Sequence, residues 1–420
     1  MQAVIQIPAS NSQMGKHKAG ELLMCEVAGV PLLRRTVLTA IRAGITDILL
    51  ICRDAPGRAS ALELLREAFV NGSRLRVTQV SNFEPDDSAN WAKLEPKVDS
   101  HFFWIPWNWV TNKQFLTNLP LQNRTSVDWA EPAHISLYEN VLDEAASEAI
   151  PSASHAEGVR VASPDDVTNA ERFLVARSGK ILDGIHTGFN RRLCRPFVRL
   201  LSHTSITPNE VTVGGVIISV LSAFSFARGG YLYSVLGALL FYVAGLFDEM
   251  DGMLARIKFA ESPRGTWLEG FADGLSYLLL FGGITMGLSH QYGRPAILMG
   301  ILLLLGAVLA LVATSLQRLR ATTADRPNEY LGRMYQLLDK DSGNWVSRVV
   351  RQLQAFVRRG ILVHYVVIFT VIGALPLLFA LATVGAHLTW ILTLYFNRRF
   401  FAQTFRAGST PTVNTMKETL

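Results

Sequence analysis

The stretch Phe247 to Asp273 reads FDEMDGMLARIKFAESPRGTWLEGFAD, and it decides most of what this chain can be. Its acidic residues Asp248, Asp251, Glu269 and Asp273 stand at the edges of two apolar runs. Within each pair the spacing is three or four residues, which places both carboxylates on one face of a helix. Carboxylates at a membrane boundary are unfavourable unless they are paired, metal-bound or hydrated. The stretch therefore indicates a functional site, with a purely structural acidic cluster as the alternative.

The flanking sequence predicts a membrane domain. From about residue 210 onward the chain of 420 residues contains apolar runs that approach the roughly 20 residues a membrane-crossing helix needs. Ahead of the first run, Thr207 suits an N-cap and Pro208 suits the first helical position. We expect six membrane helices, at 209–226, 231–249, 269–288, 295–317, 360–375 and 377–396. The boundary between the last two, near Pro376, is the least sharply defined.

Basic residues predict the orientation of these helices. The net charge of +6 comes from Lys and Arg that cluster beside the apolar runs, which fits anchoring at anionic headgroups better than binding of nucleic acid. Nine Lys or Arg fall in the loop 318–360, whereas the connections on the opposite side carry only Arg228 and Arg294. Positively charged loops face the cytosol. We therefore expect an integral protein of the cytoplasmic membrane, with both termini and the acidic stretch on the cytosolic side.

The first part of the chain predicts a soluble α/β domain. Strand-like runs at 3–7, 45–51 and 75–80 alternate with helical patterns at 34–43 and 59–70, which indicates βαβ units and a Rossmann-like parallel sheet. A short strand at 101–106 and a helix at 165–176 follow. A basic amphipathic helix is expected at 185–201, lying in the headgroup plane, with a solvated surface helix as the alternative. The expected divisions are 1–180, a linker 181–206, a membrane domain 207–400 and a tail 401–420.

The acidic stretch predicts a metal centre that handles phosphate. Four carboxylates brought together by two adjacent helices would repel, at roughly 4 kcal/mol per pair at a separation of about 4 Å. A hard divalent cation such as Mg²⁺ or Mn²⁺ relieves this repulsion. Gly252 and Gly265 leave room beside the backbone, and Arg256 offers a planar fork to phosphate oxygens.

The spacing of these residues resembles the signature of CDP-alcohol phosphotransferases, D-x2-D-G-x2-A-R-x8-G-x3-D-x3-D. Every spacing matches, and the one departure in residue type is Glu269, where the family has Asp. The resemblance implies one or two Mg²⁺ or Mn²⁺ ions held by Asp248, Asp251, Glu269 and Asp273, with Asp273 also acting as the base. It implies that Gly252, Ala255, Arg256 and Gly265 bind the CDP and phosphate end of the donor. Arg318 and Arg320 could hold an acceptor phosphate, or could simply anchor the chain at the cytosolic face.

The first part of the chain is similar to sugar-phosphate nucleotidyltransferases, through Val27 to Asp54. Where that family has a compact glycine-rich loop, this chain has PASNSQMGKHKAGELL. Asn108 and Ala162 stand where the resemblance places two metal-binding carboxylates, and an amide and a methyl group are poor replacements. Asp165 and Asp166 are then interpreted as charges that favour a helix start. The order of domains resembles bifunctional cytidylyltransferase–phosphotransferases of inositol-phosphate synthesis, with the first activity lost.

The combined hypothesis is a membrane transferase that moves a phosphatidyl or phospho-alcohol group from a CDP-alcohol to an acceptor hydroxyl and releases CMP. CDP-diacylglycerol is the simplest donor if the first domain no longer makes one. The resemblance also implies a homodimer embedded among membrane lipids. The alternatives are a bifunctional enzyme with an active first domain, and a non-catalytic membrane scaffold or sensor.

Overall fold

The computed structural model describes residues 2–14, 16–66, 73–84, 90–91, 94, 98, 101–118, 125–126, 158–178, 185–321 and 359–396. Contacts divide the chain into two compact units. The first unit contains Met1–Ile181 together with two later segments, Arg195–Ile206 and Met253–Ala260, and the second contains the rest of the chain. Each unit has its own hydrophobic core.

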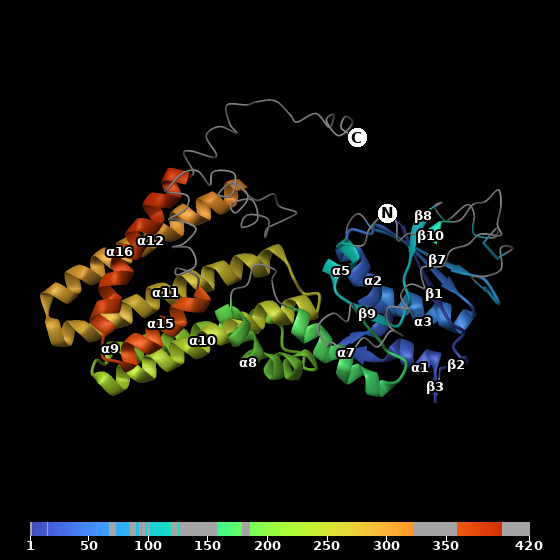
Figure 1. Ribbon diagram of the computed structural model, residues 1–420, viewed down its shortest axis with the longest axis horizontal. Helices are drawn as coiled ribbons and strands as arrows, with labels where there is room; N and C mark the ends of the chain where they lie inside the picture. The colour runs from blue at the N-terminus through green and yellow to red at the C-terminus, as the bar shows by residue number, and fades with distance from the viewer. Residues whose placement is uncertain are drawn as a thin grey trace, which may run out of the picture. The chain divides into compact units, whose positions relative to one another are not determined.

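The first unit is an α/β domain built on a sheet of five strands. The strand order is β10-β8-β1-β6-β7; β8, β1, β6 and β7 are parallel and the edge strand β10 is antiparallel. The predicted parallel sheet is thus confirmed (Figure 1). The described elements are β1 (Gln2–Ile7), β2 (Gln13–Met14), β3 (His17–Lys18), α1 (Ala19–Met24), β4 (Glu26–Val27), β5 (Val30–Pro31), α2 (Leu32–Arg42), β6 (Asp47–Cys52), α3 (Ala55–Leu65), β7 (Arg74–Gln79), β8 (His101–Trp104), β9 (Trp109–Thr111), α5 (Lys113–Asn118), β10 (Thr125–Ser126), β11 (Gly158–Arg160) and α7 (Pro164–Arg177).

Both faces of this sheet are buried, as expected of parallel strands. Successive side chains of a strand point to opposite faces. Ile5 of β1 and Leu50 of β6 therefore pack with helices α1, α2, α3 and α7 in the larger core. Val4 and Leu49 point the other way, into a second core that is rich in aromatic residues, including Trp91. Because both faces are buried, the sequences of β1 and β6 are almost continuously apolar.

Two hydrogen bonds to the Asp54 carboxylate fix the loops that follow β1 and β6. Asp54, directly after β6, caps α3 by accepting a hydrogen bond from the Gly57 N–H at 2.8 Å. The same carboxylate accepts the Ser10 N–H at 2.6 Å, which ties down the loop after β1. Because the cap sits at Asp54, α3 begins four residues earlier than the pattern at 59–70 predicts.

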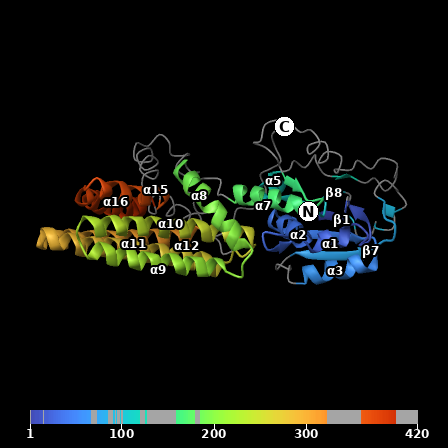
Figure 2. The same ribbon diagram turned by 90° about the horizontal axis from the view of Figure 1, so that it is seen from below.

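The second unit is helical. Its described elements are α9 (Pro208–Ala227), α10 (Tyr231–Ile257), α11 (Pro263–Tyr292), α12 (Arg294–Ala321), α15 (Arg359–Val371) and α16 (Leu375–Phe396), and it shares α8 (Ile185–Ser202) and the end of α10 with the first unit. Helix α11 packs against α9 and α12, and α12 packs against α16, so these helices lie side by side (Figure 2).

Within the part of the chain that the structure describes, five helices are long and apolar enough to cross a membrane by length and composition: Pro208–Ala227, Tyr231–Ile257, Pro263–Tyr292, Arg294–Leu316 and Leu375–Tyr395. The expected sixth crossing is not confirmed. The described part of α15 has 13 residues, which span about 20 Å at the rise of an α-helix, against about 30 Å of hydrocarbon. The break between α15 and α16 lies at Gly373, with φ 74°, so that Pro376 falls inside the first turn of α16.

Small residues let α9 and α11 approach closely. A Cβ atom placed on Gly283 would lie 2.4 Å from the Ala223 carbonyl oxygen, so only glycine fits there. Elsewhere in the contact between α9 and α11, the Ser219 hydroxyl donates to the Ser276 hydroxyl at 3.0 Å. Close backbone approach and side-chain hydrogen bonds are typical of helix pairs in membranes.

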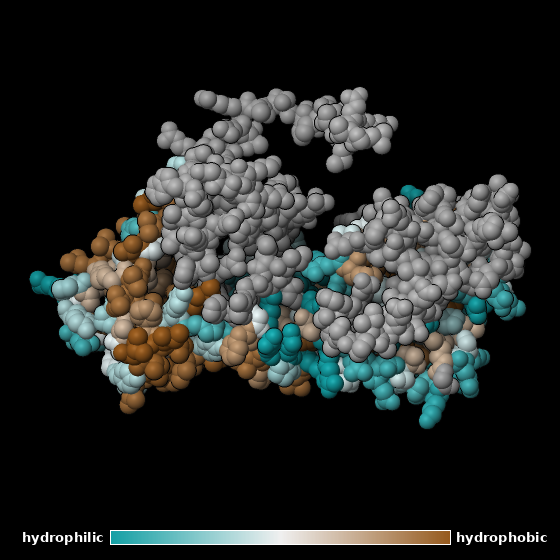
Figure 3. Space-filling view, in the orientation of Figure 1, coloured by the Kyte–Doolittle hydropathy of each residue, from teal (hydrophilic) through white to brown (hydrophobic). Residues whose placement is uncertain are grey.

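Exposed apolar side chains cover the second unit. Figure 3 shows hydrophobic residues gathered over α9, α15 and α16. On α9 alone, Ile217, Leu221 and Phe224 are each more than half exposed. An apolar surface of this extent marks a contact with lipid or protein in preference to water. The composition and surface of this unit therefore suggest an integral membrane protein.

Candidate active site

The acidic stretch lies on two helices, and both extend further than the apolar runs predict. Helix α10 continues eight residues past the expected end at 249, so Asp248, Asp251 and Arg256 all project from one unbroken helix. Helix α11 begins at Pro263, because the Ser262 hydroxyl accepts a hydrogen bond from the Gly265 N–H at 3.0 Å and caps it. The polar residues are therefore part of the helices themselves.

Asp251 is the most enclosed of the four acidic residues, with 4% of its surface exposed. Its Oδ2 accepts a hydrogen bond of 2.5 Å from the Thr212 hydroxyl on α9. Its Oδ1 is buried and has no hydrogen-bond partner among the described residues. Asp248 and Glu269 both interact electrostatically with Asp251, although Glu269 comes from the neighbouring helix α11. The charges of Asp248 and Glu269 are thus close enough to act on the Asp251 carboxylate.

Asp273, the predicted base, lies one turn after Glu269 on α11 and is half-buried, with its Oδ1 shielded from solvent. This placement gives it one carboxylate edge inside the helix bundle. The described residues contain no group of three or more His, Cys, Asp or Glu side chains already arranged to hold a metal ion. Asp248, Asp251, Glu269 and Asp273 are therefore not gathered around one point in this structure.

The donor set nevertheless suits a hard divalent cation. All four side chains offer carboxylate oxygens, the ligands that Mg²⁺ and Mn²⁺ prefer. A buried carboxylate oxygen without a partner is rare and needs a reason, and a bound cation would satisfy such an oxygen. Asp251 Oδ1 supplies that observation here. Asp248, Asp251 and Glu269, with Asp273, are the residues that would hold the ion.

The predicted phosphate-binding residues lie on α10, α11 and α12, and their role stays a prediction. Gly265 is at the start of α11, and a Cβ atom on it would lie 3.1 Å from the Ser262 Oγ and 3.4 Å from the Asn209 Oδ1. Gly252 and Ala255 are half-buried on α10. The Arg256 Nε donates to the backbone carbonyl of Ser178 at the end of α7. Arg318 and Arg320 fall in the last turns of α12, where side chains lie outside the described residues.

Sequence reasoning missed two polar contacts around the acidic stretch. Thr212 is one turn into α9, and its hydroxyl bridges the Pro208 carbonyl at 3.1 Å and the Asp251 carboxylate. Arg191 of α8 forms an ion pair of 3.2 Å with Glu249, and both side chains are largely buried. For Thr212, a polar side chain near the start of an apolar helix could have indicated a buried polar contact. No sequence pattern pairs Arg191 with Glu249.

In the first unit, Asn108 and Ala162, which are predicted to stand in place of two carboxylates, take part in local hydrogen bonds. Asn108 is buried, and its amide donates to the Val161 carbonyl at 3.0 Å, while the Val161 N–H donates back to the Asn108 carbonyl at 2.9 Å. The N–H of Ala162 donates to Asp166 at 3.0 Å. Asp166 also completes a capping box with Ser163 at the start of α7, so its predicted role as a helix-start charge is confirmed.

The second unit is thus a bundle of apolar helices that carries acidic residues on two of them, α10 and α11. Residues 205–395 match the family model described as CDP-alcohol phosphatidyltransferase. The C-terminal part of the chain is therefore a CDP-alcohol phosphatidyltransferase domain.

Curated relatives agree with this family. The chain is 25% identical over 240 residues to a "Bifunctional IPC transferase and DIPP synthase" of Aquifex aeolicus (strain VF5), covering 56% of this chain and 49% of the relative. It is 32% identical over 90 residues to an "Archaetidylinositol phosphate synthase" of Pyrococcus horikoshii, covering 21% and 46%. It is 30% identical over 108 residues to a "Phosphatidylinositol phosphate synthase" of Mycobacterium bovis (strain BCG / Pasteur 1173P2), covering 26% and 49%. The chain spans about half the length of the curated relatives it matches.

Proposed function

We propose that the chain is a membrane transferase that moves a phosphatidyl group from CDP-diacylglycerol to an acceptor hydroxyl and releases CMP. The observation that carries this proposal is the buried Asp251 oxygen, which has no hydrogen-bond partner among the described residues and stands beside acidic residues of two helices in a domain of this family. The names of the relatives favour a phosphorylated polyol as the acceptor.

The reaction is a substitution at phosphorus. The acceptor oxygen forms a bond to the phosphorus that carries the diacylglycerol, the pyrophosphate P–O bond breaks, and CMP leaves with the electron pair of that bond. Asp273 accepts the proton of the attacking hydroxyl. A Mg²⁺ or Mn²⁺ ion, when bound, neutralises charge on the pyrophosphate. Asp248, Asp251 and Glu269 position that ion, and the Thr212 hydroxyl orients the Asp251 carboxylate.

A liponucleotide is the proposed donor because the first unit lacks two carboxylates for a nucleotidyltransferase reaction. Asn108 and Ala162 take part in structural hydrogen bonds, as described above, and neither offers a charged oxygen. We therefore propose that the first unit keeps a Rossmann-like, nucleotidyltransferase-like fold without its catalysis. The strand order β7-β6-β1-β8, with its reversal beside β1, supports that fold.

The proposed topology has six crossings with the acidic residues on the cytosolic side, and α15 supplies the fifth. The Tyr231 hydroxyl at the start of α10 donates to the Val371 carbonyl at the end of α15 at 2.9 Å, so these two ends meet at one side of the bundle. Arg228 and Arg294 are the basic residues of the connections on that side, and the excess of Lys and Arg lies on the other. Assembly as a homodimer is part of the same proposal.

The test is CMP release by the purified full-length protein from CDP-diacylglycerol, with Mg²⁺ or Mn²⁺ and a panel of polyol and polyol-phosphate acceptors. Replacement of the general base, Asp273→Asn, is expected to lower the rate by about 10² to 10⁴. The matched control is Asp165→Asn, an identical change at an exposed position of the first unit, which leaves the rate unchanged. Metal-independent release, or equal rates for Asp273→Asn and the parent protein, contradicts the proposal.

A further inference from the structure

A cavity of about 560 Å³ lies within the first unit, and its lining includes none of Asp248, Asp251, Glu269 and Asp273. Its walls come from three parts of the sequence: the β4–β5 hairpin with helix α2, the turn that follows α8, and the two residues that follow α10. All three belong to the first unit. Cavities of roughly 300–1,000 Å³ are the size that holds small organic ligands.

One wall is a single face of α2. Arg34, Leu38, Ile41 and Arg42 are spaced by four, three and one residues, and all four line the cavity. Residues at these spacings share one side of a helix. The α2 wall therefore presents a guanidinium group near each end, with two aliphatic side chains between them.

The opposite wall is fixed by hydrogen bonds. The Lys258 ammonium donates to the carbonyl oxygens of Thr204 at 2.6 Å and Ile206 at 3.0 Å, which holds the turn after α8. The Arg42 guanidinium lies 4.8 Å from the centre of the Phe259 ring, close enough for a cation–π contact. Lys258, Phe259 and Thr204 all line the same space.

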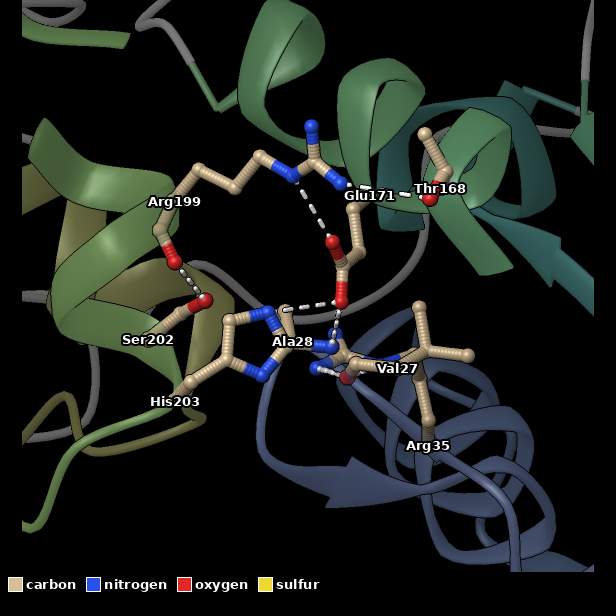
Figure 4. A network of polar contacts seen from close by, with 8 residues as sticks. All are labelled: Val27, Ala28, Arg35, Thr168, Glu171, Arg199, Ser202 and His203. Atoms are coloured by element: carbon tan, nitrogen blue, oxygen red, sulfur yellow. Dashed lines mark hydrogen bonds and ion pairs between the residues drawn. The ribbon is translucent and has the colours of Figure 1, made fainter. Parts of the chain in front are cut away.

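The network in Figure 4 keeps the two walls together. The buried Glu171 carboxylate accepts the Ala28 N–H at 3.1 Å, pairs with Arg199 at 2.9 Å and meets the His203 Nε2 at 2.9 Å. Beside it, Gly29 adopts a φ of 71°, and a Cβ atom there would lie 2.3 Å from the Ser202 carbonyl oxygen. The hairpin and the end of α8 are thus held at a separation that only glycine permits.

The cavity has an excess of positive charge. Arg34, Arg42 and Lys258 line it, and Glu26 is its acidic residue. His203 also lines it, with its Nε2 directed to Glu171. Glu171 itself is paired with Arg199 and is not part of the lining. An anion entering this space meets three cationic groups against one carboxylate.

We infer that this cavity binds the phosphate group of a small phosphorylated alcohol or of a lipid headgroup. Two arginines offer planar forks that match phosphate oxygens, and the hydroxyl of Ser205 adds a donor. Leu38, Ile41 and Phe259 give the carbon part of the ligand an apolar surface. Lys258 directly follows a candidate membrane span, which makes a lipid headgroup one source of the phosphate. This inference stands whether or not the chain releases CMP.

The test measures phosphate binding by the full-length protein in EDTA, which removes divalent ions from the acidic residues. Isothermal titration of glycerol 3-phosphate, in nanodiscs of phosphatidylcholine alone, detects a soluble ligand. We expect the dissociation constant to rise by about tenfold or more in Arg34→Gln/Arg42→Gln, because charge-assisted hydrogen bonds are lost. The single variant Arg34→Gln, expected to weaken binding by a smaller factor, serves if the double variant does not fold.

The matched control is Arg58→Gln/Arg66→Gln, which removes the same charge from exposed positions beyond the cavity lining. It is expected to bind like the parent protein. A lipid source is detected by native mass spectrometry, in which the parent protein retains phosphatidylglycerol and Arg34→Gln/Arg42→Gln does not. Binding in either arm that depends on the two arginines supports the inference. Equal binding by the parent and the double variant, or no binding in both arms, overturns it.

Discussion

At the scale of single residues, Glu171 is the most consequential buried charge of the first unit. Its carboxylate is 2% exposed and joins the backbone of the hairpin, α7 and the residues at the end of α8 (Figure 4). The neighbouring Arg35 is also buried, donates twice to the Val27 carbonyl, and lies 5.2 Å from the centre of the Phe259 ring. Burial lowers the pKa of Arg35 to about 9, and the charge of Glu171 opposes that change.

Glu171→Ala is therefore expected to destabilise the first unit. It leaves the buried Ala28 N–H without an acceptor, at a cost of about 1–3 kcal/mol, and lowers the melting temperature of that unit by on the order of 5 °C. Glu171→Gln keeps one acceptor and loses less. Glu63→Ala, at an exposed position of α3, is the control. Limited proteolysis during heating measures the melting temperature of the first unit in each variant. Equal melting temperatures for Glu171→Ala and Glu63→Ala would contradict the prediction.

Cys52 gives a prediction on pH. Burial raises the pKa of its thiol to about 12, from an ordinary value of 9.0. Between these pH values the unfolded chain loses the proton while the folded chain keeps it, so the free energy of unfolding falls as pH rises through this window. Below pH 9 both states are protonated and the thiol contributes no pH dependence.

Cys52→Ala is expected to reduce the loss of thermal stability between pH 9 and about 11, measured against the parent protein. In the native protein at pH 8, iodoacetamide is expected to leave Cys52 unmodified, because the thiolate is the reactive form. The same reagent in denaturant modifies it, which is the internal control. Rapid native labelling of Cys52, found by mass spectrometry, contradicts this assignment.

At the scale of elements, the α9–α11 contact depends on where glycine stands. Gly283 has the Ala223 backbone within 2.4 Å of an added Cβ, whereas Gly282 has nothing within 4 Å. Gly283→Leu is expected to separate the two helices and to lower stability by several kcal/mol, as overpacking does in tightly packed interiors. Gly282→Leu adds the same side chain on open space. The melting temperatures of the two variants are compared in detergent, with size-exclusion chromatography as the readout of folded protein. Similar melting temperatures for both variants would contradict a close contact at Gly283.

The amphipathic pattern of helix α8 predicts its exposed face but not its buried one. The basic and apolar residues at 185–201 predict a surface helix, and the structure leaves Phe189, Phe197 and Leu200 more than half exposed along it. The pattern does not predict that Cys194 and Val198 are buried on the other face. Its placement in the headgroup plane stays a prediction.

At the scale of the whole molecule, the proposed topology is open to a direct test. In cells, a membrane-impermeant maleimide is expected to label Gly230→Cys and Gly293→Cys, in the connections on the side opposite the acidic residues, in a background without the three native cysteines. Ser262→Cys, between α10 and α11, is expected to react only after the membrane is permeabilised. Labelling of Ser262→Cys in intact cells would reverse the orientation that the basic residues predict.

The sequence by itself determined the class of both parts. Apolar runs of membrane length, the spacing from Asp248 to Asp273 and the alternation of strands and helices each depend on neighbours in sequence, because helix faces and strand faces repeat at fixed intervals. These local periods predicted the parallel sheet, the start of α9 at Thr207 and the family of the C-terminal domain. The crossing that they predict at 360–375 is not confirmed, because the 13 described residues of α15 are too few to cross a bilayer by length alone.

Only the tertiary structure decided which side chains meet. Thr212 reaches Asp251 across 39 residues, and Arg191 reaches Glu249 across 58. Arg256, which belongs to the signature by spacing, donates to the Ser178 carbonyl across 78 residues. The cavity of Arg34, Arg42 and Lys258 likewise draws on distant segments. Contacts of this kind depend on how elements pack, and no period in the sequence encodes them.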